Sequence, residues 1–238
     1  MSASRQSWIG MGLALLIIAA WLVLHVSGIF FMDLARPLPS LLLLVALTWL
    51  SVGVYIVAHD AMHGSLCPAN RAAGNFIGAV AVWLYAGFTF QRLVPKHHAH
   101  HRSPGSADDP DFAVAAPNRA FGWYGQFMKA YFGPREMLVM ALRVGLYMLL
   151  GARLQNILLF FAVPGLLSSF QLFYFGTFLP HRQLPEDGTA RFADHHRTRS
   201  NDYGTLMSLL TCFHFGYHHE HHLHPCEPWW RLPALRRP

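Results

Sequence analysis

The 238-residue chain is 53% hydrophobic and only 13% charged, and its apolar residues stand in long blocks. Its net charge of +6 comes from basic residues that form no dense block, which argues against nucleic-acid binding. The three cysteines, Cys67, Cys212 and Cys226, form no CxxC pair and indicate neither a disulfide framework nor a zinc ribbon. Length and composition predict one all-α membrane domain over residues 1–238.

The first two apolar blocks predict membrane-spanning helices at about 8–31 and 38–58. Neither block contains Asp, Glu, Lys or Arg, and each reaches the ~20 helical residues that cross a hydrocarbon core. A signal peptide is the alternative for the first block, because Arg5 precedes it. That block is too long for one, and no small-x-small cleavage site follows. Two crossings return the chain to its starting side, where His59 and His63 follow.

The segment at about 73–94 is predicted to be interfacial or re-entrant. Its uncharged core, Phe76 to Phe90, is short for a crossing. The segment also leads to His97, which must lie on the same side as His59 if the histidine clusters share one site. A single crossing here would put His97 on the opposite side.

A second helical hairpin is predicted from spans at about 137–151 and 154–179, which return the chain to the histidine side at His181. The first of these spans is short and carries Arg143, which is costly to insert unless it snorkels or faces protein. The expected fold is therefore four transmembrane helices, interfacial or re-entrant helices, and a histidine-rich cap.

The distribution of basic residues predicts the orientation. Of the 18 Lys and Arg residues, only Arg36 and Arg153 fall in the far-side turns, and Arg143 lies within a span. Positive charge concentrates on cytoplasmic loops of membrane proteins. We therefore expect a multi-pass protein whose histidine-rich cap faces the cytoplasm.

Three histidine clusters follow the apolar segments. Residues at i, i+3 and i+4 share a helix face, so His59 and His63 face the same way. The second cluster offers two registers, either His97, His100 and His101 or His97, His98 and His101. The third offers the same two, either His218, His221 and His222 or His218, His219 and His222. Spacing alone leaves both registers open.

Imidazole suits iron, zinc and copper, and these clusters hold more imidazoles than one metal ion uses. A structural zinc site would be closed by four ligands, often with cysteine, so two metal ions fit better and redox-active iron is plausible. Isolated histidines such as His25, His195 and His196 are expected to be ordinary interfacial residues. The carboxylates expected to fix imidazole tautomers are Asp60, Asp109, Asp111 and Glu220.

The boxes HDAMH, HHAHH and HHEHH resemble the pattern of the membrane fatty-acid desaturase and hydroxylase superfamily. The strings AHDAMHGS, KHHAHHRSPGSADDPDF, FGTFLPHR and LLTCFHFGYHHEHHLHPCEPWWRLP resemble the bacterial β-carotene 4-ketolases over nearly the whole chain. This resemblance implies one register and adds a ligand at His181, with His214 in reserve. The implied metal ligands are His59, His63, His97, His100, His101, His181, His218, His221 and His222.

The resemblance also implies the chemistry. Enzymes of this kind use O2 and two non-haem iron ions to oxidise the C4 methylene of a β-ionone ring to a ketone. β-Carotene from the bilayer would give echinenone and canthaxanthin, and zeaxanthin would give astaxanthin. The resemblance further implies a bacterial inner-membrane location and a ferredoxin-type electron donor. The chain has no GxGxxG and no haem-attachment motif, which is consistent with electrons coming from another protein.

Basic residues on the histidine side would attract either an acidic electron donor or anionic lipid headgroups. They are Arg92, Lys96, Arg102, Arg191, Arg197 and Arg199. Rival functions are a lipid desaturase or hydroxylase, or a carotenoid hydroxylase, of the same superfamily. A metal transporter is the non-enzymatic alternative, but it would place ligands inside the spans, where His25 stands alone.

Overall fold

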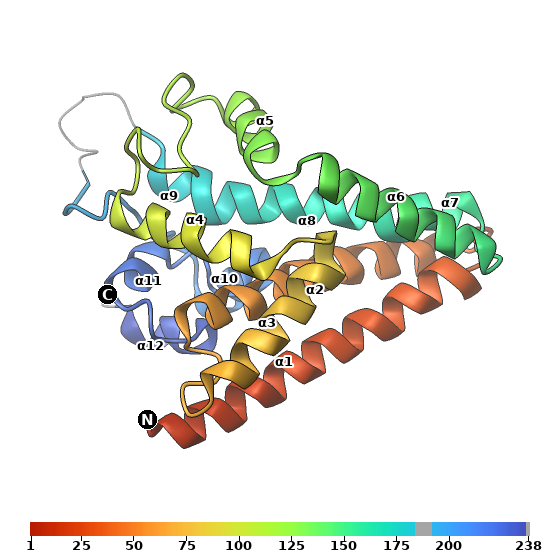
Figure 1. Ribbon diagram of the computed structural model, residues 1–238, viewed down its shortest axis with the longest axis horizontal. Helices are drawn as coiled ribbons and strands as arrows, with labels where there is room; N and C mark the ends of the chain where they lie inside the picture. Colours follow the sequence, from red (N-terminus) through yellow and green to blue (C-terminus); the bar gives the residue numbers. More distant parts are fainter. Residues whose placement is uncertain (184–191, 237–238) are drawn as a thin grey trace. The chain divides into compact units, whose positions relative to one another are not determined.

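The computed structural model describes residues 1–183 and 192–236, which form helices and connecting segments without a β-strand (Figure 1). The expected all-α class is confirmed. The chain divides into two compact units, each built from two stretches of sequence. Unit 1 comprises Met1–Phe90 and Pro134–Ser169, and unit 2 comprises Gln91–Gly133 and Phe170–Pro238.

Three helices are long and apolar enough to cross a membrane: Ala3–Phe31, Pro37–His63 and Leu154–His181. They correspond to the spans predicted at 8–31, 38–58 and 154–179, so the chain is a membrane protein. The span predicted at 137–151 is a shorter helix, α6 (Pro134–Leu149), of 16 residues. The segment predicted at 73–94 is two helices, which qualify as a span only if taken together as one bent pair.

Unit 1 is held together by close helix contacts. The Trp21 indole N–H donates to the Ser51 hydroxyl at 2.9 Å, joining α1 to α2. A Cβ at Gly78 would lie 2.5 Å from that of Ala61, so the glycine allows α2 and α3 to approach. Its elements are α1 (Ala3–Val26), η1 (Ser27–Phe31), α2 (Pro37–His63), α3 (Arg71–Ala86), the first residue of α4 (Phe90–Arg102), α6, α7 (Leu154–Ile157), η2 (Leu158–Ala162) and most of α8 (Val163–Phe173).

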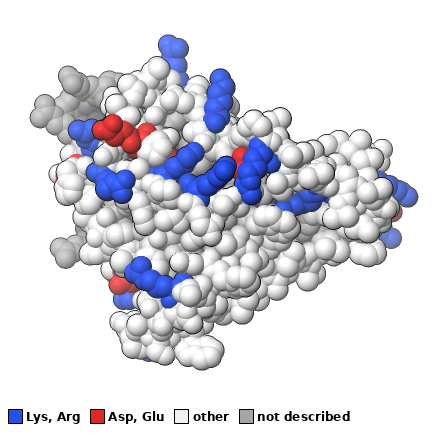
Figure 2. Space-filling model, in the orientation of Figure 1, with Lys and Arg blue, Asp and Glu red and all other residues white. Residues whose placement is uncertain are grey.

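The outer faces of the unit 1 helices are apolar. Wide areas of the face drawn in Figure 2 show no Lys, Arg, Asp or Glu. Exposed apolar side chains on α1 and α2 would be unfavourable in water and suit hydrocarbon. Examples are Leu15, Leu16, Val23, Leu41, Leu42 and Val45.

Arg143 on α6 faces protein. Facing protein and snorkelling are the two arrangements in which its charge is tolerated within an apolar segment. Its guanidinium donates to the carbonyl oxygens of Leu84 at 2.6 Å and Trp83 at 2.8 Å. These carbonyls belong to the last turn of α3, where the helix dipole favours a cation. The guanidinium also lies over the Trp83 ring, 4.9 Å from its centroid.

Unit 2 is built around an aromatic core of Phe112, Trp123, Phe173 and Phe178. The Trp123 indole N–H donates to the Asp111 carbonyl at 2.6 Å, so the loop that precedes α5 is packed rather than free. This loop carries Asp109 and Asp111 to fixed positions. The elements of unit 2 are the rest of α4, α5 (Ala120–Tyr131), the end of α8, η3 (Tyr174–Phe178), α9 (Leu179–His181), α10 (Thr205–Cys212), α11 (His218–Leu223), η4 (Trp229–Arg231) and α12 (Leu232–Leu235).

Candidate metal centre

Four imidazoles from three helices of unit 2 converge in its interior. They are His100 on α4, His181 on α9, and His218 and His222 on α11, and all are buried. One nitrogen of each lies within 4.8 Å of the others. The Nε2 atoms of His181 and His218 are 3.0 Å apart, and those of His218 and His222 are 3.1 Å apart. We call these four residues the buried histidine group.

Two members of this group have their other ring nitrogen fixed by a hydrogen-bond acceptor. His100 Nδ1 lies 3.0 Å from both carboxylate oxygens of Asp109. His181 Nδ1 lies 2.9 Å from the carbonyl oxygen of Arg197. An Nδ1 proton in these bonds leaves the Nε2 lone pair free for a metal ion.

The spacing of the buried histidine group fits a metal ion. Imidazole nitrogens bind a metal at ~2.0–2.1 Å, so two ligands of one ion stand about 3 Å apart. Burial lowers the pKa of His222 well below its usual value, and the neighbouring His218, His101, His100 and His181 lower it further. The His222 ring is therefore neutral, which metal binding requires.

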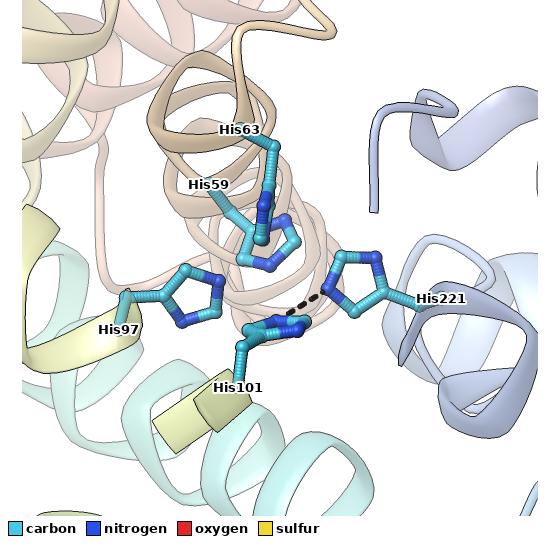
Figure 3. Close-up of side chains that lie close together, drawn as sticks. All are labelled: His59, His63, His97, His101 and His221. Atoms are coloured by element: carbon cyan, nitrogen blue, oxygen red, sulfur yellow. Dashed lines mark hydrogen bonds between the residues drawn. The ribbon is translucent and has the colours of Figure 1, made fainter. Parts of the chain in front are cut away.

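A second set of imidazoles lies beside the first. His97 and His101 on α4 and His221 on α11 face one another, and the Nε2 atoms of His101 and His221 are 3.1 Å apart (Figure 3). We call these three residues the second histidine group. In unit 1, His59 and His63 lie one turn apart at the end of α2, with ring centroids 4.9 Å apart, and we call them the α2 pair (Figure 3).

The carboxylates expected beside the histidines occupy different positions. Asp109 is buried and also accepts the backbone N–H of Gly105 at 2.8 Å. Asp111 has an oxygen 3.8 Å from His100 Nδ1 and accepts a hydrogen bond from the Tyr131 hydroxyl. Burial raises the pKa of Asp111, and the neighbouring Asp109 adds to this, whereas His100, Tyr131 and Lys96 oppose it.

The other two carboxylates have different surroundings. An Asp60 oxygen lies 3.8 Å from His59 Nδ1, and both residues are buried at the end of α2. Glu220 accepts a hydrogen bond from the Ser200 hydroxyl. The Glu220 side chain therefore contacts the segment before α10. The sequence pattern did not indicate this contact.

Two histidines of the clusters and the reserve candidate His214 lie outside both groups. His98 is in neither, and His219 Nδ1 is 2.8 Å from the Thr198 hydroxyl. The ring of His214 stacks with the rings of Tyr217 and Trp229, whose centroids are 5.9 and 6.0 Å away. Burial lowers the pKa of His214 to about 4. The two groups therefore include the residues of the register that the resemblance implied, which are His97, His100 and His101 on α4 and His218, His221 and His222 on α11.

Sequence reasoning missed the contributions of residues 197–201. The carbonyl of Arg197 holds His181, and the side chains of Thr198 and Ser200 contact α11. No spacing or residue type in this stretch signals such contacts, because a backbone carbonyl carries no sequence signature.

The family model described as fatty acid desaturase matches residues 34–144 and 134–238. These matches include all three histidine clusters, all of unit 2 and the part of unit 1 that follows residue 33.

Three relatives with curated names are similar over most of the chain. A β-carotene ketolase of Paracoccus sp. (strain PC1) is 50% identical over 96% of this chain and 93% of its own length. A β-carotene ketolase of Paracoccus sp. (strain N81106 / MBIC 01143) is 50% identical over 92% of this chain and 89% of its own. A zeaxanthin 4-ketolase of Chlamydomonas reinhardtii is 38% identical over 96% of this chain and 53% of its own.

Proposed function

The chain belongs to the β-carotene ketolases of the fatty acid desaturase family, and we propose that it oxidises the C4 methylene of a carotenoid β-ionone ring to a ketone. β-Carotene would give echinenone and then canthaxanthin, and zeaxanthin would give astaxanthin. The observation that carries the proposal is the convergence of buried imidazole nitrogens in a chain 50% identical to two β-carotene ketolases. These relatives do not favour a lipid desaturase, a lipid or carotenoid hydroxylase, or a metal transporter.

The reaction balances as two successive hydroxylations at one carbon. Each inserts one oxygen atom of O2 at C4 and reduces the other to water with two electrons and two protons. The resulting geminal diol loses water and leaves the ketone. Two iron ions, when bound, would supply the activation of O2; the protein residues hold the ions and exclude bulk water from them.

We assign the buried histidine group to one iron and the second histidine group, joined by the α2 pair, to the other. All-imidazole ligation suits iron. Three imidazoles leave coordination positions open, and the α2 pair offers two more on one helix face. The proposed ligands are therefore His59, His63, His97, His101 and His221 for one ion, and His100, His181, His218 and His222 for the other.

The contact of His100 with His181 supports four crossings. Their ring centroids are 4.7 Å apart, so the two residues lie on the same side of the membrane. Leu154–His181 is one span between them, so a second crossing is needed. At 1.5 Å per residue, the 16 residues of α6 extend about 24 Å, and local thinning of the bilayer can accommodate such a short span.

The proposed orientation places the histidines in the cytoplasm of a bacterial inner membrane, where a ferredoxin-type donor would supply electrons. Arg92, Arg102 and Arg197 are exposed, and they would attract an acidic donor or anionic lipid headgroups. Arg191, from the same predicted basic face, lies outside the described residues.

Expression in cells that accumulate β-carotene tests the proposed activity. Aerobic cells with an electron donor should form echinenone and canthaxanthin, measured by pigment chromatography. His100→Ala should abolish the ketones, because it removes a proposed ligand. The matched variant His98→Ala should retain them, because His98 lies in neither group. Absence of ketocarotenoids with the unaltered protein would refute the ketolase proposal, and an active preparation without iron would refute the di-iron centre.

A further inference from the structure

The stretch from Arg197 to Asn201 forms no helix, yet it contacts two elements that carry proposed ligands. On one side, the Arg197 carbonyl accepts from His181 Nδ1 at 2.9 Å. The Arg199 backbone N–H donates to the Pro180 carbonyl at 3.1 Å. Residues 197 and 199 thus bind α9. We call this stretch the 197–201 segment.

The alternate residues of the 197–201 segment bind α11. The Thr198 hydroxyl lies 2.8 Å from His219 Nδ1, and Thr198 is buried. The Ser200 hydroxyl oxygen accepts the backbone N–H of His219 at 3.0 Å, and the hydroxyl donates to the Glu220 carboxylate. Successive residues therefore face different helices, as they do in an extended chain.

Helix α11 needs outside support. It has six residues, and its own N-cap residue, Tyr217, makes no side-chain capping bond. A helix this short is unstable alone, and its first backbone N–H groups have no partner within the helix. Ser200 supplies the acceptor that an N-cap residue normally supplies, although it comes from a distant part of the chain.

We propose that Ser200 and Thr198 are positioning residues that fix α11, so that His218, His221 and His222 reach their ligand positions. Since all three ligands stand on one short helix, a shift of α11 displaces ligands of both metal ions. This inference rests on the proposed metal binding by these histidines.

Titration of the metal-free full-length protein in detergent with Co2+ tests the inference, because the ligand-field bands of Co2+ report ligand geometry without any turnover. Ser200→Ala should weaken Co2+ binding about 10–100-fold, the usual effect of losing a residue that orients the ligands of a metal site, and should shift the bands. Ser200→Thr keeps the hydroxyl and should restore both. Thr205→Ala, at an exposed threonine on α10, is the matched control and should change neither.

Thr198→Val provides a second variant that preserves side-chain shape, and it should also weaken Co2+ binding. If Ser200→Ala does not fold, Thr198→Val alone decides: weakened binding supports the inference and unchanged binding overturns it. If both variants fold and bind Co2+ as the unaltered protein does, the inference is wrong. If the unaltered protein itself binds no Co2+ or iron, the proposed metal centre fails instead.

Discussion

An imidazole binds a metal through one nitrogen when the other nitrogen holds the proton, so the acceptors of that proton decide which histidines can serve. His100 has a carboxylate in this role, and His181 has a backbone carbonyl. The carboxylate adds charge as well as orientation, because it makes the bound ring a stronger donor to the metal. Asp109 is thus the side chain whose substitution tests the buried histidine group most directly.

Asp109→Asn should reduce retained iron, because the amide removes the negative charge opposite His100 Nδ1 and disturbs the hydrogen bond from Gly105. We expect metal affinity to fall about 10–100-fold. The measurement is iron per chain after dialysis against graded chelator. Asp108→Asn is the matched control, because Asp108 is exposed in the same loop and should leave iron content unchanged. Equal iron retention in both variants would contradict the role of Asp109.

At the scale of elements, the last long helix is interrupted where it approaches the site. Residues Tyr174–Phe178 form a π-helical turn, η3, directly before α9 and His181. Such turns are rare and often occur at functional sites. Within η3, Gly176 faces Phe215, whose ring centroid lies 4.9 Å from that of His218 and 5.2 Å from that of His221. Phe215 therefore links η3 to the proposed ligands on α11.

Gly176→Ala should destabilise the protein. The added Cβ would meet Phe215 Cδ1 at 2.7 Å, a distance that requires the ring to move. Overpacking of this kind costs about 1–3 kcal/mol and should lower the thermal midpoint in detergent. Phe215→Leu in the Gly176→Ala background should recover part of the loss. Gly165→Ala on α8, with open space around its Cβ, should not lower the midpoint, and a loss as large as that of Gly176→Ala would contradict the steric explanation.

An element could be predicted from the sequence only where a local pattern of residues specifies it. Charge-free runs indicated the long helices, but α2 continues past residue 58 to His63 and ends at Gly64, whose φ is a positive 70°. The segment at 73–94 divides because Gly87, with a positive φ of 69°, ends α3. The partners of Arg143 and the contacts of the 197–201 segment involve backbone carbonyls or distant residues, which leave no periodic pattern in the sequence.

At the scale of the whole molecule, the chain passes between its two units along α4, before α6, and along α8, so each unit holds residues from both halves of the sequence. The histidine clusters indicated which residues gather, because ligand spacing on a helix is local. They could not indicate the acceptor carbonyl of Arg197 or the side-by-side placement of α9 and α11. Those depend on how the end of the chain folds onto η3.

The proposed four-crossing topology makes a prediction about both faces of the membrane. Because His100 and His181 lie close together, the proposal requires α6 to cross, with Gly151 in the turn after it facing away from the histidines. Phosphatase fusions, active only outside the cytoplasm, should be active after Asp33 and after Gly151. A fluorescent reporter that folds only in the cytoplasm should be bright after Leu235. If Asp33 and Gly151 report opposite sides, α6 does not cross; if every reporter inverts, the crossings hold and the charge-based orientation is wrong.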